Sequence, residues 1–299
     1  MIKMKAISLF SRILAFGICM VTASVTLTAA SAPLTATSQP SLSSFTSIAK
    51  FVKGTLYTNP KYNTPKASGK SAYDFNKDGK KEAISFTYKY NDEDMGNLML
   101  TVGSATVKLK PMYFDGIYYV DLDKSDKSVE IAVQMSAEDD DVYTDFYRYN
   151  GKLVKLGEVY GNIADNRKGM LFGDYNSGIL TDGKGDLIPR FGAIQFVSPQ
   201  ILREYLTLRG NKLVDVKPNL SGALNKTYTV SGNSTPFFEP MSAIAKNFMP
   251  RCQTSDQITL KKGEKITIKS ISSDFGNMYC MLVQLPNKKT GVLYYFLHP

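Results

Sequence analysis

The sequence predicts an all-β protein in which a repeated sheet unit is followed by a small barrel. Apolar residues alternate with polar ones over short runs that end in Gly or Asn turns, a pattern typical of strands. An acidic loop followed by a strand recurs along the chain, which indicates a repeated structural unit. We therefore expect a repeat domain at residues 46–222 and the barrel at residues 223–299.

The first 45 residues precede the expected folded part. Residues 1–30 combine basic side chains, an apolar run and a final cluster of small residues, which are the features of a secretory signal peptide. The alternative is a retained membrane anchor, but the apolar run is short for a span of about 20 residues. Residues 31–45 are rich in Ser, Thr, Ala and Pro and are expected to form a linker. The sequence thus predicts a secreted or cell-surface protein without a stable membrane span after signal cleavage.

Charge and cysteine content restrict the possible partners. The formal net charge is +9, and a basic exported protein can associate with an anionic wall or membrane surface, although solubilising lysines explain the same charge. The absence of an arginine-rich run argues against nucleic acid as a partner. Once Cys19 has left with the signal, Cys252 and Cys280 remain, either as a disulfide or as two free thiols.

The acidic loop at residues 74–82 has the pattern of a cation site. Oxygen side chains occupy positions 1, 3, 5 and 9, and Gly79 permits the sharp turn that lets them converge. Hard oxygen donors suit Ca²⁺, but position 12 is Ser85 and a strand follows, so the loop is not an EF-hand. The same residue types also favour turns that bind no metal. The predicted ligands are the side chains of Asp74, Asn76, Asp78 and Glu82 and the backbone carbonyl of Lys80.

A second copy of this pattern begins about 47 residues further along the chain. Residues 120–131 repeat the order of acidic loop, Glu and apolar strand found in residues 73–84. Each copy continues to a strand that ends in a tight turn, at Gly103-Ser104 in the first and Asn150-Gly151 in the second. Asn-Gly between alternating strands is a strong hairpin signal, so we expect a hairpin there.

A third, eroded copy completes the repeat. One hairpin is expected at residues 178–188 and another at residues 205–214, although the acidic pattern is lost. A period of about 47 to 60 residues with four strands is typical of a propeller blade. We expect about three four-stranded blades in a propeller-like repeat, either closed or open.

The Asp-x-Asn-x-Asp-Gly-x-x-Glu loop at 74–82, set in a strand-rich repeat, resembles the FG-GAP/VCBS repeats of integrin-α-like β-propellers. The resemblance covers roughly residues 70–216 and implies that Ca²⁺ binds in the loops that keep the pattern. The second loop departs from it, because Ser125 stands at position 5 and Glu is displaced by one residue. The ligands that the resemblance implies there are Asp121, Asp123, Asp126 and Glu130.

The C-terminal region changes to short alternating strands separated by Gly and Asn turns, which suits a small barrel. The turn at 260–264 and the segment 289–294 resemble those of a bacterial SH3-like domain. Such domains commonly carry Trp after the last Gly, whereas this chain has Val292 there and no Trp. The resemblance implies a barrel that contacts the cell wall or a partner protein.

The sequence favours a binding protein over an enzyme. Its only histidine is the penultimate residue, His298, which argues against Ser-His or Cys-His nucleophiles and against His-ligated zinc. We therefore expect a secreted or cell-wall-associated bacterial protein that binds a cell-wall polymer, or a surface protein or carbohydrate, without catalysis. The alternative is a carboxylate-dependent hydrolase of cell wall or polysaccharide, because paired carboxylates can cleave glycosides.

Overall fold

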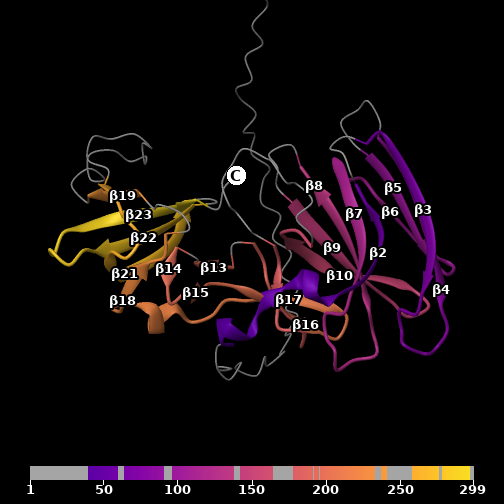
Figure 1. Ribbon diagram of the computed structural model, residues 1–299, viewed down its shortest axis with the longest axis horizontal. Coiled ribbons are helices and arrows are strands. Elements are labelled where there is room, and N and C mark those ends of the chain that lie inside the picture. The colour runs from indigo at the N-terminus through magenta and orange to yellow at the C-terminus, as the bar shows by residue number, and fades with distance from the viewer. Residues whose placement is uncertain are drawn as a thin grey trace, which may run out of the picture. The chain divides into compact units, whose positions relative to one another are not determined.

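The computed structural model describes residues 40–59, 64–90, 96–137, 142–163, 178–190, 192–194, 196–232, 237–240, 258–275 and 278–296. These residues form antiparallel sheets, and their helical segments are 3-10 turns of three or four residues (Figure 1). The all-β prediction is confirmed. The expected signal peptide, most of the expected linker, Cys252 and His298 lie outside the described residues.

The first sheet is an antiparallel meander of four strands that follow one another in the chain. Its strands are β3 (Lys66–Tyr73), β4 (Glu82–Tyr90), β5 (Gly96–Val102) and β6 (Ala105–Leu109). The acidic loop joins β3 to β4, and Gly103 turns the chain between β5 and β6 with a φ of 56°. Alternate residues of β4 and β5 are buried, so one face of the sheet lies against the core and the other faces outward.

The second sheet repeats this meander and adds one edge strand. Its order is β10-β9-β8-β7-β2, with strands β2 (Val52–Thr58), β7 (Tyr113–Val120), β8 (Glu130–Ser136), β9 (Val142–Tyr149) and β10 (Leu153–Tyr160). The second acidic loop again joins the first two strands of the meander, β7 and β8. The Asn150-Gly151 hairpin is present between β9 and β10, and Gly151 has the left-handed φ of 68° that favours glycine.

The third sheet contains both hairpins expected in the eroded copy. Its order is β1-β11-β12-β16-β17, with strands β1 (Thr46–Ser47), β11 (Leu180–Thr181), β12 (Asp186–Ile188), β16 (Tyr205–Arg209) and β17 (Lys212–Val216). The pairings β11–β12 and β16–β17 confirm the two hairpins. Three short strands interrupt the meander between β12 and β16, namely β13 (Ala193–Ile194), β14 (Val197–Ser198) and β15 (Ile201–Leu202).

The C-terminal sheet has the order β14-β18-β21-β22-β23-β19-β20. Its other strands are β18 (Thr227–Val230), β19 (Phe237–Pro240), β20 (Ile258–Thr259), β21 (Lys265–Phe275), β22 (Met278–Gln284) and β23 (Thr290–Phe296). The segment around Gly263 is a turn between two strands, as expected, but β20 pairs with β19 rather than with β21. An edge strand of this sheet, β14, comes from before residue 222.

Each acidic loop is anchored by an apolar side chain at its second position. Phe75 in the first loop and Leu122 in the second are both fully buried. Phe75 packs edge-on against Tyr119, with ring centroids 5.1 Å apart, in the core shared by the first two sheets. Leu122 packs with residues of the second and third sheets. The cores therefore fix where the polar residues on either side of each anchor are placed.

The chain before β1 also contributes to a core. A 3-10 turn spans Leu42–Ser44, and Phe45 is buried with Ile188 and Tyr205. Two further 3-10 turns span Ile48–Phe51 and Leu220–Ala223. Across the described part of the chain, no helix has the length and apolar character needed to cross a membrane.

Candidate functional site

The first acidic loop is held in shape by its own oxygen side chains. Asp74 accepts hydrogen bonds from the backbone N–H groups of Asp78 (3.1 Å) and Gly79 (2.9 Å). Asn76 Oδ1 accepts from Asp78 N (3.1 Å), and Asp78 Oδ1 accepts from Lys80 N (2.8 Å). Gly79 has a φ of 88°, where a side chain would be strained. The three oxygen-bearing side chains therefore gather around one short stretch of backbone.

A glutamate closes each loop in the same way. Glu82 Oε2 accepts from Phe75 N (3.0 Å), and Glu130 Oε2 accepts from Leu122 N (3.1 Å). Each glutamate is the first residue of the second strand of its meander, and each donor follows the first Asp of its loop. The one-residue insertion in the second loop therefore leaves this contact intact. The repeat in the sequence therefore corresponds to a repeated hydrogen bond between the glutamate and the loop backbone.

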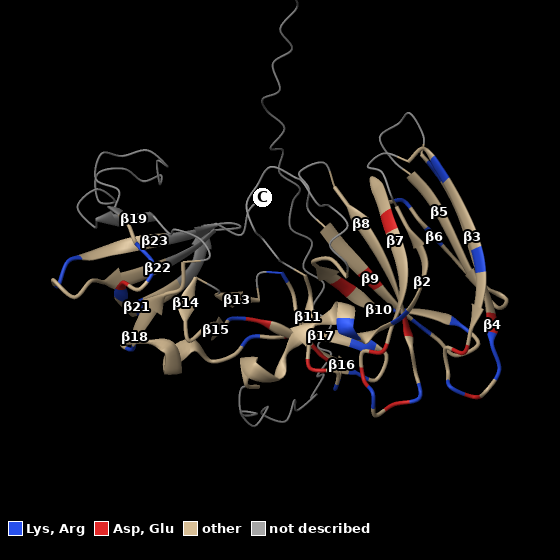
Figure 2. Ribbon diagram, in the orientation of Figure 1, with Lys and Arg blue, Asp and Glu red and all other residues tan. Residues whose placement is uncertain are grey.

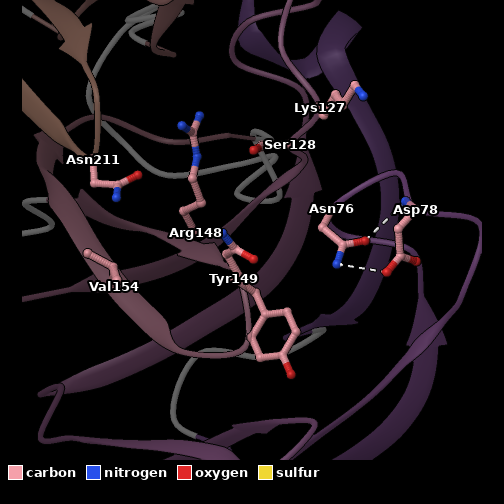
Figure 3. Close-up of a pocket in the computed structure, with 9 residues that line it drawn as sticks. Asn76, Asp78, Lys127, Ser128, Arg148, Tyr149, Val154 and Asn211 are labelled. Carbon is pink, nitrogen blue, oxygen red and sulfur yellow. Dashed lines mark hydrogen bonds between the residues drawn. The ribbon is translucent and has the colours of Figure 1, made fainter.

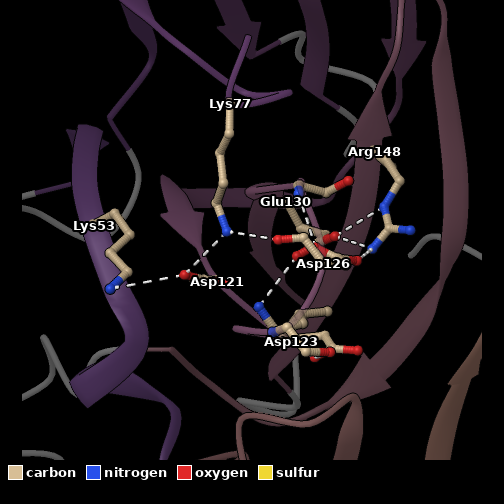
Figure 4. Close-up of polar contacts among 10 residues, drawn as sticks. Lys53, Lys77, Asp121, Asp123, Asp126, Glu130 and Arg148 are labelled. Carbon is tan, nitrogen blue, oxygen red and sulfur yellow. Dashed lines mark hydrogen bonds and ion pairs between the residues drawn. The ribbon is translucent and has the colours of Figure 1, made fainter. Parts of the chain in front are cut away.

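Arg148 neutralises the second loop from the neighbouring strand β9. Its Nη2 donates to Asp126 Oδ2 (2.7 Å) and to Glu130 Oε1, and its Nε also donates to Glu130 Oε1 (2.9 Å) (Figure 4). A further hydrogen bond joins Nη1 to the carbonyl of Gly210 (3.3 Å). Arg148 thus holds two of the predicted ligands and ties the second sheet to the turn between β16 and β17.

Two lysines face Asp121, another predicted ligand of the second loop. Lys77 Nζ lies 3.6 Å and Lys53 Nζ lies 3.8 Å from Asp121 Oδ2, and Lys77 Nζ also donates to the carbonyl of Asp126 (3.1 Å) (Figure 4). Lys77 belongs to the first loop, where its φ is 53°. An ammonium group from the first loop is therefore one of the counter-ions of the second loop.

Burial raises the pKa of the Glu130 carboxyl above its ordinary value, although its charge and hydrogen-bond contacts with Arg148 lower the pKa in part. The side chain of Glu130 is fully buried. The fourth predicted ligand, Asp123, accepts from Ser125 N (2.9 Å) and Ser125 Oγ (2.6 Å). The structure therefore separates the second predicted ligand set into three local clusters with different partners.

The two loops differ in how well they suit a divalent cation. Among the described residues, no group of three or more His, Cys, Asp or Glu side chains is gathered as a metal site. In the first loop, Asp74, Asn76 and Asp78 are hard oxygen donors whose partners in the described structure include backbone and amide N–H groups. Each carboxylate oxygen has two lone pairs, so one hydrogen bond leaves capacity for a cation. The chemistry of this donor set fits Ca²⁺, whereas carboxylates of the second loop are already paired with cations from β2, β9 and the first loop.

A pocket of about 350 Å³ lies beside the loops (Figure 3). Its lining comes from the first loop, the second loop, the β9–β10 hairpin and the β16–β17 turn. The lining residues are Asn76, Asp78, Lys127, Ser128, Arg148, Tyr149, Asn150, Val154 and Asn211. Two predicted Ca²⁺ ligands, Asn76 and Asp78, thus belong to both the loop and the pocket wall.

The acidic-loop pattern in the sequence does not indicate the cations of this site. Lys77 occupies a position of the loop pattern that any residue can fill. Arg148 occupies a polar position of a strand in which polar and apolar residues alternate. A signal for Arg148 is present in Phe146-Tyr147-Arg148-Tyr149, where a charged residue stands among aromatic ones. Such a residue needs a partner when its neighbours are buried. The identity of that partner required the fold.

Comparison with known proteins gives no match to a protein-family model, to a curated protein or to a solved structure.

Proposed function

We propose that this chain is a secreted or cell-wall-associated binding protein that holds a hydroxyl-rich surface ligand in the loop pocket without catalysis. The ligand would be a cell-wall polymer or a surface carbohydrate. The observation that carries this proposal is the pocket lining, which combines three asparagine side chains with a serine, a lysine and an aspartate. Amides both donate and accept hydrogen bonds, as sugar hydroxyls do. The pocket volume lies at the small end of ligand sites.

The sheet arrangement supports a propeller-like reading of the repeat domain. Three sheets contain a meander of four strands, and the acidic loop or its remnant joins the first two strands of each. We interpret these meanders as about three blades and the C-terminal sheet as an SH3-like barrel that contacts the wall or a partner. The loops of propeller blades gather at one end, which suits a ligand site formed by several repeats.

Ca²⁺ in the first loop would fix part of the pocket wall. The side chains of Asp74, Asn76, Asp78 and Glu82 and the carbonyl of Lys80 would hold the ion. Asn76 and Asp78 also line the pocket, so ion binding would order them for the surface ligand. The proposed Ca²⁺ site does not include the second loop, because Lys53, Lys77 and Arg148 pair with Asp121, Asp126 and Glu130, three of its four predicted ligands.

The contacts of the second-loop carboxylates weigh against the hydrolase alternative. A glycosidase needs two carboxyl groups that reach the bond to be cleaved. Glu130 is fully buried, Asp121 is 6% exposed, and Arg148 pairs with both Asp126 and Glu130. These three carboxylates are therefore used in burial and ion pairs within the protein. This favours binding over hydrolysis as the function.

Calcium is expected to stabilise the protein through the first loop. At about 100 times Kd, an ion that binds only the folded state adds roughly 2.7 kcal/mol to the free energy of unfolding. Asp78→Ala should remove most of this gain, and Asp215→Ala, which removes an exposed carboxylate on β17, should preserve it. Melting temperatures with millimolar Ca²⁺ and with chelator would measure the effect, and calorimetry would measure binding. An unchanged melting temperature of the wild type, together with no heat of binding, would show that the loop is only a turn.

Retention on purified peptidoglycan tests the proposed function. We expect the protein to sediment with peptidoglycan in Ca²⁺ and to bind less in chelator. Asn211→Ala removes one exposed amide of the pocket. It should weaken retention by about fivefold, because the loss of one hydrogen bond costs about 1 kcal/mol. Gln200→Ala removes an exposed amide elsewhere and should have no effect. Equal retention of all three proteins would refute the pocket, and release of reducing sugar would favour the hydrolase.

A further inference from the structure

The outward face of the first sheet is basic and carries no acidic side chain. The one acidic residue of its four strands, Glu82, shares the inward side of β4 with Ile84 and Phe86. Along β3, Figure 2 shows blue bands and no red. Five lysines are exposed on this face or directly after its last strand, and none makes an ion pair in the described part of the chain: Lys66, Lys70, Lys89, Lys108 and Lys110. We call this surface the lysine face.

Register places two charges of the lysine face side by side. Lys66 and Lys89 are directly paired across β3 and β4, and like charges opposite each other destabilise a sheet. Lys108 is paired with Met99 on the β5–β6 side. The ammonium groups of Lys66 and Lys89 therefore repel each other in the folded protein, and a bound anion would reduce this repulsion. Four strands spaced about 4.8 Å apart spread these charges over roughly 14 Å, more than a single small anion can contact.

Small hydroxyl side chains fill the space between the lysines. Ser68 and Thr87 are paired across β3 and β4, and Thr101 and Thr106 share a hydrogen bond across β5 and β6 (2.9 Å). A groove of about 610 Å³ with a largely apolar wall crosses this face. It is lined by Lys66, Ala67, Ser68, Thr87, Tyr88, Lys89, Asn97, Leu98, Met99, Lys108, Leu109 and Lys110. Ammonium and hydroxyl groups together can bind the oxygens of a phosphate or the hydroxyls of a polyol.

We propose that the lysine face binds a linear anionic polymer whose repeating unit is a polyol phosphate. Charge complementarity favours this occupant, because a chain with regularly spaced phosphates can contact several lysines at once. Binding of single-stranded nucleic acid relies on aromatic stacking, and the lysine face exposes no aromatic ring or arginine. Insertion into a membrane needs a broad apolar face, whereas Met99 is the one large apolar side chain exposed here. The lysine face shares no residue with the lining of the loop pocket, and its ligand has a different chemistry.

A charge-matched pair of variants tests the lysine face. The first variant combines Lys66→Gln, Lys89→Gln and Lys108→Gln. The control combines Lys212→Gln, Lys261→Gln and Lys289→Gln, which are exposed lysines on β17 and in two turns of the C-terminal region. The probe is poly(glycerol phosphate), with affinity measured by calorimetry at two salt concentrations. The face variant should bind at least about tenfold more weakly, since each lysine near an anionic surface contributes about 1 kcal/mol. The control should bind within twofold of wild type, and wild-type affinity should fall as salt rises.

Further probes and variants separate this inference from its alternatives. Equal weakening in both lysine variants would show unspecific attraction and overturn the proposal. Equally tight binding of single-stranded DNA, or preferred binding of phosphatidylglycerol vesicles, would overturn it in favour of those partners. Asn211→Ala and chelator should leave polymer affinity unchanged, so a failure of the loop pocket and a failure of the lysine face are distinguishable. A melting temperature of the face variant at or above that of wild type would confirm that it is folded.

Discussion

Replacing Arg148 with methionine is expected to lower the free energy of unfolding by about 3–5 kcal/mol at neutral pH. Methionine keeps much of the side-chain volume but leaves Glu130, which is fully buried, without its cation. Asp126 loses its ion-pair partner as well, and the bond to the Gly210 carbonyl disappears. Chemical denaturation measures the loss. Arg209→Met is the matched control, because Arg209 is exposed on β16 and its removal should cost less than about 1 kcal/mol.

The effect of Arg148→Met should shrink as the pH falls. The folded-state pKa of Glu130 is raised above its ordinary value of 4.5, so the folded protein holds this proton more tightly than the unfolded chain. The stability that Glu130 contributes is therefore present below pH 4.5 and is lost as the pH rises through the folded-state pKa. Removal of Arg148 raises that pKa further, so Glu130 becomes neutral at a higher pH in the variant. Denaturation at several pH values should show wild type and variant converging on acidification.

A double variant checks the cause of the loss. When Glu130→Gln is added to Arg148→Met, no uncompensated charge remains in the core, so the double variant should be more stable than Arg148→Met alone at neutral pH. If the double variant is as unstable as the sum of its single variants, the pair does not act through charge compensation. In that case Arg148 contributes through packing and its bond to Gly210.

Replacing Phe75 with alanine is the second change with a large expected effect. Phe75 is fully buried and packs against Tyr73 and Tyr119, with ring centroids 5.2 Å and 5.1 Å away. Truncation of a buried phenylalanine removes apolar contacts and leaves a cavity, at a cost of about 3–5 kcal/mol. Denaturant titration of the variant should show a lower midpoint. Tyr160→Ala is the control, because Tyr160 is 55% exposed and its loss should be small.

The Phe75→Ala variant also links the core to the first loop. The backbone N–H of Phe75 is the donor to Glu82, and Asp74 and Asn76 lie on either side of it. Loss of the anchor should therefore reduce the stabilisation by Ca²⁺ as well as the stability of the apo protein. A variant with full Ca²⁺ stabilisation would show that the loop keeps its shape without the buried ring. Phe75→Leu, which retains an apolar anchor, should fall between the wild type and Phe75→Ala in both measurements.

The sequence by itself determined the all-β class, the repeated order of loop and strands, and the hairpins at Asn150-Gly151 and in the third copy. These features depend on local chemistry. Alternation of apolar and polar residues defines strands, and glycine or asparagine supplies the backbone conformation of tight turns. The sequence also indicated that the residues around 74–82 and 121–130 form corresponding loops. The matching bonds from Phe75 to Glu82 and from Leu122 to Glu130 agree with that correspondence.

The tertiary structure decided which charges meet. Lys77 is separated from Asp121 by 44 residues in the chain, and Arg148 reaches both Asp126 in the second loop and the carbonyl of Gly210 in the third sheet. Ion pairs of this kind have no periodic signature, because they arise where separate sheets bring side chains together. The lysine face is similar, since only the strand register places Lys66 opposite Lys89. Local patterns therefore specify strands and turns, whereas the partners of charged side chains follow from packing between distant segments.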